Sequence, residues 1–302
     1  MNKFAGVFLA VTALFAGAAV AQQSTFSGLD GVISHIVDGD GWKTSISLNN
    51  IDAGPSQYKV SFFAETGAPL SLQTNLGTGT FVYGTIPARG TVVIETAGTK
   101  VALSQGWAKM ETIFQVPGPG FVIAPGARVA GTVPFLRPPT VSRPIEVSEP
   151  LDFSLEQKWV LPFDHLNGYS SGVALVNQET FQDISVFVSF FDEAGNQIGA
   201  VDAFTLLRGN HLSFTVTDRY PPTVGKRGTI KIESSSVPLN VLGFRVSPTG
   251  FFTSTSPSFL TALNLSPAGN ELSRDSNCFC FSYRLLTMRC IEANSVSMAH
   301  IV

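Results

Sequence analysis

The 302-residue sequence predicts an all-β protein in which two tandem immunoglobulin-like β-sandwich domains follow a cleaved signal peptide. Three observations support this prediction. The chain opens on a short apolar stretch, apolar and polar residues alternate in many later segments, and one long block occurs twice in the same order.

The N-terminus has the features of a secretory signal peptide. Lys3 supplies a positive charge, and the apolar residues 4–20 lead into Ala19-Val20-Ala21, the small-x-small pattern that signal peptidase cleaves. The alternative is a membrane anchor, but a spanning helix needs about 20 strongly apolar residues, and this stretch is shorter and diluted by small ones. We therefore expect residues 1–21 to be removed and the mature chain to be secreted, periplasmic or held at the cell surface, without membrane insertion.

The composition excludes some partners and some means of stabilisation. The formal net charge is −3, and lysine and arginine are scattered along the chain. A nucleic-acid partner is not expected, because nucleic-acid binding needs a clustered basic surface. The cysteines are Cys278, Cys280 and Cys290, all close to the C-terminus. Disulfides and cysteine-based metal sites therefore do not hold the two expected domains together.

The alternation of apolar and polar residues predicts strands. It is clearest in residues 45–48, 58–62 and 184–190. Such a period places one side chain in a core and the next in solvent, as in antiparallel sheets packed face to face. Each copy of the repeated block contains about seven such segments separated by turn residues, which is typical of an immunoglobulin-like sandwich. Sustained helical periodicity is missing after the signal peptide.

The internal repeat indicates a duplication. Val60-Ser61-Phe62-Phe63 recurs as Val188-Ser189-Phe190-Phe191, and Glu-x-Gly follows both copies. Four further pairs keep the same order: Gly41-Trp42 with Gly168-Tyr169, Arg89-Gly90 with Arg208-Gly209, 106–111 with 228–233, and 129–131 with 241–243.

The repeat also sets the expected domain boundaries. The proline-rich residues 134–150 resemble a linker, but they align with 244–257 and so belong to the first copy. We expect domains at 22–152 and 153–258 with a short junction between them. An atypical, disordered tail is expected over 259–302, and it could be translated from an altered reading frame.

One segment matches a catalytic pattern. Residues 168–172 fit the G-x-S-x-G motif of serine hydrolases, with Ser170 as nucleophile and His211 and Asp202 as available partners. The motif requires a turn between a strand and a helix, whereas here it stands at the start of an expected strand. The first copy, residues 41–45, also lacks the serine pattern. We predict that the protein is not an enzyme and that Ser170 is structural.

No cofactor or metal is predicted. Asp38 and Asp40 lie in one glycine turn and could form a calcium corner, but the further oxygen ligands of an EF-hand are missing. An ordinary Asp-Gly turn is the favoured interpretation. The four histidines, His35, His165, His211 and His300, lack metal-ligand spacing, so we expect them at the surface or in turns.

Trp42 and Tyr169 are the candidate binding residues. They occupy equivalent positions in the two copies, each directly after a glycine. An aromatic side chain beside a turn can form a platform for a sugar ring or a partner surface. Its alternative role is to close one end of a sandwich core.

The blocks Asp-Gly-x-Gly-Trp, Val-Ser-Phe-Phe and Arg-Gly-Thr-Ile-Lys-Ile-Glu, the last of them at 227–233, together resemble an uncharacterised class of exported bacterial proteins. In that class, paired β-sandwich repeats follow a signal peptide. The resemblance covers roughly residues 34–257 and implies an immunoglobulin-like accessory or surface module, with no catalytic residue to transfer. The tail departs from the pattern.

These observations favour a non-catalytic secreted protein that binds a polysaccharide or a surface protein, as in adhesion. Loops on rigid sheets would carry recognition, and two copies could gain avidity on one polymer. A purely structural surface module is the alternative, and a serine hydrolase using Ser170 is the third hypothesis.

Overall fold

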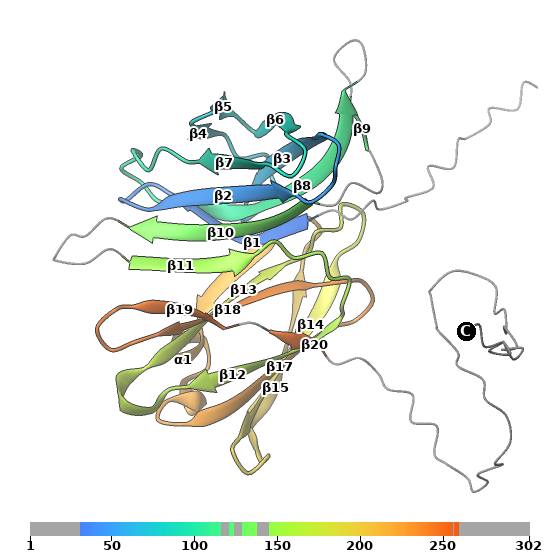
Figure 1. Cartoon of the computed structure of the whole chain (residues 1–302). Helices are drawn as coiled ribbons and strands as arrows, with labels where there is room; N and C mark the ends of the chain where they lie inside the picture. The colour runs from blue at the N-terminus through green and yellow to red at the C-terminus, as the bar shows by residue number, and fades with distance from the viewer. Residues whose placement is uncertain (1–30, 116–120, 124–128, 138–144, 256, 260–302) are drawn as a thin grey trace, which may run out of the picture. The chain divides into compact units, whose positions relative to one another are not determined.

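Antiparallel sheets make up most of the part of the chain that the structure describes, which confirms the all-β prediction (Figure 1). The computed structural model describes residues 31–115, 121–123, 129–137, 145–255 and 257–259. The predicted signal peptide, the tail from residue 260, His300 and the three cysteines lie outside these residues. Within the described part of the chain, no helix is long and apolar enough to cross a membrane.

The first repeat contains two main sheets, ordered β1-β8-β3-β6, with β9 also on β8, and β11-β10-β2-β7. A short pair, β4-β5, lies beside them. The strands are β1 (Gly31–Asp38), β2 (Lys43–Asn50), β3 (Ser56–Ala64), β4 (Leu72–Thr74), β5 (Gly77–Gly79), β6 (Phe81–Ile86), β7 (Thr91–Glu95), β8 (Ser104–Gln115), β9 (Phe121–Ile123), β10 (Val129–Arg137) and β11 (Ile145–Pro150).

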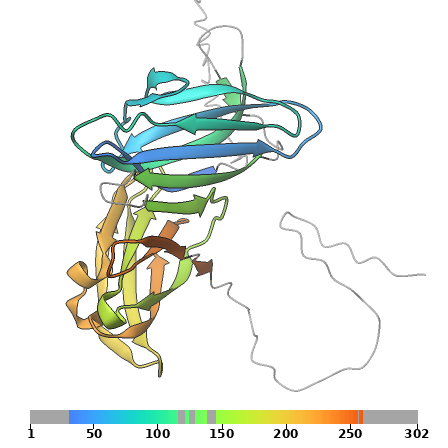
Figure 2. The ribbon, with the colours of Figure 1, turned by 60° about the vertical axis from the view of Figure 1, so that its left-hand side comes forward.

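The second repeat contains two sheets ordered β15-β14-β17-β12-β20 and β16-β13-β18-β19. Its elements are β12 (Lys158–Asp164), η1 (Leu166–Gly168), β13 (Ser170–Val176), β14 (Ile184–Asp192), β15 (Gln197–Leu206), β16 (His211–Thr215), α1 (Val216–Arg219), η2 (Pro221–Thr223), β17 (Arg227–Ser234), β18 (Asn240–Val246), β19 (Phe252–Thr255) and β20 (Ser258–Phe259). Neighbouring strands in both repeats run in opposite directions, as the view in Figure 2 also shows.

The two repeats share one strand order. β12-β17-β14-β15 corresponds to β1-β8-β3-β6, and β19-β18-β13-β16 corresponds to β11-β10-β2-β7. The register agrees as well, because Val60 lies opposite Met110 as Val188 lies opposite Ile232. At the end of the proline-rich residues, β11 pairs with β10 in antiparallel fashion.

Side-chain alternation builds an apolar core in each repeat. Phe62 and Phe190 are only 1% and 2% exposed, whereas the next residues, Phe63 and Phe191, are partly exposed. Each buried phenylalanine contributes about 1.5–3 kcal/mol through removal of apolar surface from water. The predicted inward face of these two strands is therefore confirmed.

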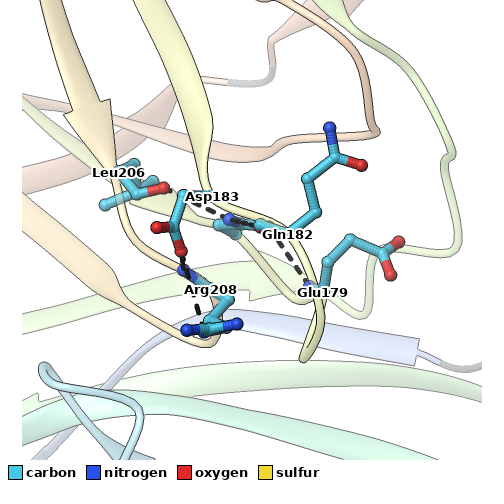
Figure 3. Close-up of polar contacts among 6 residues, drawn as sticks. Glu179, Gln182, Asp183, Leu206 and Arg208 are labelled. Atoms are coloured by element: carbon cyan, nitrogen blue, oxygen red, sulfur yellow. Dashed lines mark hydrogen bonds and ion pairs between the residues drawn. The ribbon is translucent and has the colours of Figure 1, made fainter.

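A buried asparagine closes an equivalent loop in each repeat. The Asn177 side-chain amide donates to the carbonyls of Gln182 and Leu206, and its oxygen accepts from the Glu179 amide (Figure 3). Asn50 makes the matching bonds to its own loop, including one to the carbonyl of Ile86.

These loops correct the alignment of Arg89-Gly90 with Arg208-Gly209 by one residue. The amide of Arg89 donates to Asp52, and the amide of Gly209 donates to Glu179 at the equivalent place. Arg89 has a φ of 55° and Gly209 a φ of 70°. Arg89 therefore corresponds to Gly209, because both positions need the left-handed conformation that favours glycine.

The two repeats are in direct contact. All four main sheets belong to one compact unit, and the apolar core of the first repeat includes Ala174 and Leu242 of the second. The Trp107 indole N–H donates to the carbonyl of Gly209 at 2.8 Å, and the His211 amide donates to the carbonyl of Glu65 at 2.9 Å. The side chain of Asn240 bonds Asp152 at 2.7 Å.

Candidate functional site

Trp42 lies at the turn between β1 and β2. Gly41 precedes it with a φ of 77°, a left-handed conformation that favours glycine. The partly buried ring meets the Phe252 ring edge-on at 5.9 Å, and the Arg137 guanidinium lies 5.5 Å from its centre. Arg137 also forms an ion pair of 3.2 Å with Asp40. Trp42 is thus held by contacts from both repeats.

Tyr169 has a similar set of neighbours. It follows Gly168, whose φ is 80°, and the Arg245 guanidinium lies only 3.8 Å from the ring centre. Arg245 forms an ion pair of 2.6 Å with Asp164. The Leu166 amide and the Arg245 guanidinium lower the pKa of Asp164. An aromatic ring, an arginine and an aspartate therefore recur together in both repeats.

An apolar hollow of about 200 Å³ distinguishes Trp42 from Tyr169. The lining of this hollow includes Trp42 but not Tyr169, and it comes from both repeats. Its walls include Trp42, Phe135, Phe244, Phe252, His35 and Gln105. Concave, mostly apolar surfaces with a few polar groups are typical of small ligand sites. The two residues that the sequence treats alike therefore differ in the structure, because only Trp42 borders the hollow.

The histidines correct another expectation, because they do not all lie at the surface or in exposed turns. His165 and His211 are each 4% exposed. His35 Nδ1 lies 3.1 Å from His211 Nε2, so one ring donates a hydrogen bond to the other across the contact between the repeats. Burial lowers the pKa of His35 to about 4 and also lowers that of His165.

The residues of the G-x-S-x-G pattern are not brought together. Ser170 begins β13, while His211 is paired with Val176 at the other end of that strand. Six residues of strand place these ends roughly 20 Å apart. Asp202 accepts hydrogen bonds from Arg219 and Tyr220 instead. A strand follows the serine directly, so the strand–turn–helix context of a nucleophile elbow is missing as well.

The aspartates of the first turn have separate partners. Asp38 is 1% exposed and accepts a hydrogen bond from the Gly98 amide at 2.8 Å, whereas Asp40 faces solvent and pairs with Arg137. Among the described residues, no group of three or more His, Cys, Asp or Glu side chains is arranged to hold a metal ion. Each carboxylate therefore has a partner within the first repeat, Gly98 for Asp38 and Arg137 for Asp40.

Of the residues that line the hollow, the sequence identifies only Trp42 as a candidate binding residue. Phe135, Phe244 and Phe252 were not singled out, although they lie in segments that the repeat aligns with each other. The phenylalanines at 244, 251 and 252 in the last strands of the second copy are the signal that could have identified two of them. The contact between these strands and Trp42 joins residues far apart in sequence, and the repeat pattern does not contain it.

Another pair of exposed aromatic residues was also missed. Phe81 and Tyr83 are 41% and 49% exposed on β6, with ring centres 6.2 Å apart. Tyr83 also lines a small hollow of about 60 Å³ together with Gln57, Thr85 and Ile113, which is much smaller than the hollow at Trp42. Comparison with known proteins finds no matching family model and no matching curated protein.

Proposed function

We propose that this chain is a non-catalytic, exported binding protein in which the hollow at Trp42 receives one ring of an extracellular polysaccharide. The observation that carries the proposal is the hollow itself, where an indole and three phenylalanine side chains surround a space with histidine and glutamine in its wall. Aromatic faces pack against the apolar faces of sugar rings, while polar groups select their hydroxyls.

The size of the hollow supports a small ligand group. About 200 Å³ is below the range of roughly 300–1,000 Å³ for pockets that enclose a drug-sized molecule. One ring of a longer polymer fits this volume better than a complete cofactor. The rest of such a polymer would lie over the surface outside the hollow.

The strand order supports two tandem immunoglobulin-like domains made by duplication. In the immunoglobulin fold, strand B pairs with E and strand C with F. When the short strands β4 and β5 are left aside, β2 pairs with β7 and β3 with β8, which are the same central pairs. The edges differ, because β1 joins β8 and β10 joins β2. The proposed domains therefore share the central pairing of the immunoglobulin fold and have their own edge strands.

The proposal is tested by sedimenting the purified full chain with insoluble cell-wall and plant polysaccharides. Trp42→Ala is expected to remove most binding, because it deletes the wall of the hollow. Tyr169→Ala is the matched control, since it removes the equivalent aromatic ring without touching the hollow, and it should bind as the unchanged chain does. Thermal unfolding of each variant establishes that the protein is still folded.

Each other outcome has a definite meaning. Binding that survives Trp42→Ala would contradict the site, and equal losses in both variants would point to a surface shared by the two turns. A folded chain that sediments with none of the polysaccharides would contradict this proposal and favour a protein partner or a purely structural surface module.

A further inference from the structure

We propose that His35 and His211 form an acid-sensitive latch, which holds the two repeats together near neutral pH and releases them when both rings are protonated. The latch requires only the contact between the two histidine rings, and no ligand takes part in it.

The two rings meet where the repeats meet. His35 lies in β1 of the first repeat, and His211 is the first residue of β16 in the second. Their ring centres are 5.1 Å apart with an interplanar angle of 29°, and the facing nitrogens are 3.1 Å apart. A neutral pair can share one hydrogen bond, with one ring donating and the other accepting.

Two added protons would break this bond. Both facing nitrogens would then carry hydrogen, so neither could accept, and two positive charges would lie at hydrogen-bond distance. The side chain of His211 is fully buried, and burial together with the neighbouring His35 lowers its pKa well below the usual value. Because the His211 side chain is out of contact with solvent, water screens the repulsion poorly, and separation of the repeats relieves it.

The acidic groups around the pair do not compensate for two charges. Glu149, in β11, accepts a hydrogen bond from the His35 amide at 3.2 Å, and burial raises the pKa of this carboxyl well above its usual range. The raised pKa favours the neutral form of this carboxyl, which offers no negative charge to the protonated rings. Glu65 lies 4.0 Å from His211 Nδ1, but its side chain is 46% exposed, and it faces only one of the rings. Asp152 is bonded to Asn240 and to the Ser154 amide.

The direction of the pH effect follows from the lowered histidine pKa values. In separated repeats, each exposed ring would titrate near pH 6.5, whereas the docked His35 titrates at about 4. Between these limits the separated form binds more protons, so acidification weakens docking by about tenfold per pH unit for each proton taken up. Glu149 acts in the opposite direction, because it must give up its proton when it is exposed above pH 4.5. Two histidines take up protons on separation against the one that Glu149 gives up, so docking should weaken as the pH falls from 6.5 to 4.5.

Two N–H groups report directly on docking in the full-length protein. The His211 amide bonds Glu65 and the Trp107 indole bonds Gly209, and both bonds cross between the repeats. Hydrogen-exchange protection of these groups, measured by NMR, should fall at least tenfold from pH 6.5 to 4.5. The amides of Val60 in β3 and Val188 in β14 lie inside the separate sandwiches, and they should keep their protection.

Variants separate the latch from general acid sensitivity. A His35→Gln/His211→Gln double variant can still form a side-chain hydrogen bond but cannot titrate, so the fall in protection between pH 6.5 and 4.5 should disappear. His165→Gln removes another buried histidine that lies within the second repeat, and it should leave the fall unchanged. Equal protection of the crossing groups at both pH values in the unchanged protein would overturn the latch. An unaltered fall in the double variant would do the same.

Discussion

Asn50 and Asn177 show how single residues determine the loops of this fold. Each is almost completely buried, and the amide nitrogen of each donates to one carbonyl in the loop that follows its strand and to one at the end of a distant strand. Buried polar groups need such partners, so the two positions must keep an asparagine-like side chain. The sequence marks these residues only as strand ends, because the carbonyls that they bind lie up to 37 residues away.

Replacing Asn177 by alanine should lower the free energy of unfolding by about 2–4 kcal/mol, because it leaves the buried carbonyls of the loop without a donor. Asn196→Ala is the control, since that asparagine is exposed and bonds only within its own turn. Urea unfolding of the two variants measures the difference. A loss below about 0.5 kcal/mol for Asn177→Ala would mean that water replaces the side chain without cost.

Trp42 and Tyr169 show the limit of residue-level prediction. Their place after a positive-φ glycine is readable from the repeat, and the structure gives both of them an arginine and an aspartate. The hollow itself cannot be predicted from the repeat. It exists because Phe244 and Phe252 of the second repeat reach the first, and this contact depends on docking.

Paired strands explain why the elements were predictable. A period of two residues fixes which side chains enter the core, so the segments around Val60 and Val188 could be identified as strands and assigned an inward face. The short α1 and η2 elements of residues 216–223 escaped prediction. A single helical turn has too few residues for a helical period to be seen.

Strand pairing requires a glycine at two equivalent positions, Gly106 in β8 and Gly228 in β17. A Cβ on Gly228 would lie 1.9 Å from the carbonyl oxygen of Phe191, and one on Gly106 would lie 2.0 Å from that of Phe63. Gly228→Ala should therefore lower the free energy of unfolding by about 2–3 kcal/mol through displacement of β17 from β14.

The matched substitution is Gly172→Ala in β13, where the nearest atom to the new methyl group would be 3.5 Å away. It should change stability by less than about 1 kcal/mol in either direction. Denaturant unfolding compares the two glycine variants, and equal stabilities would show that the backbone at residue 228 adjusts without loss.

At the scale of the whole molecule, the contact between the repeats joins different surfaces of two similar units. The loop of the second repeat near Gly209 meets Trp107 of the first. By strand pairing, Thr229 in the second repeat is equivalent to Trp107 in the first, and Thr91 in the first repeat is equivalent to His211 in the second. The equivalent surface of each repeat therefore lacks the residue that makes the contact. The arrangement is therefore specific to one pair of repeats. Duplication could be inferred from the sequence, but docking could not, since it depends on residues that the copies do not share.

The central claim is that a site built by both repeats binds a polysaccharide, and Phe252→Ala tests it most directly. Phe252 lies in β19 of the second repeat and contacts Trp42 in the wall of the hollow, whereas its neighbour Phe251 is 43% exposed and does not line it. Sedimentation with the polysaccharide that the unchanged chain binds should show a loss for Phe252→Ala as large as that for Trp42→Ala. Phe251→Ala should bind normally. Full binding by Phe252→Ala would contradict a site shared by the two repeats.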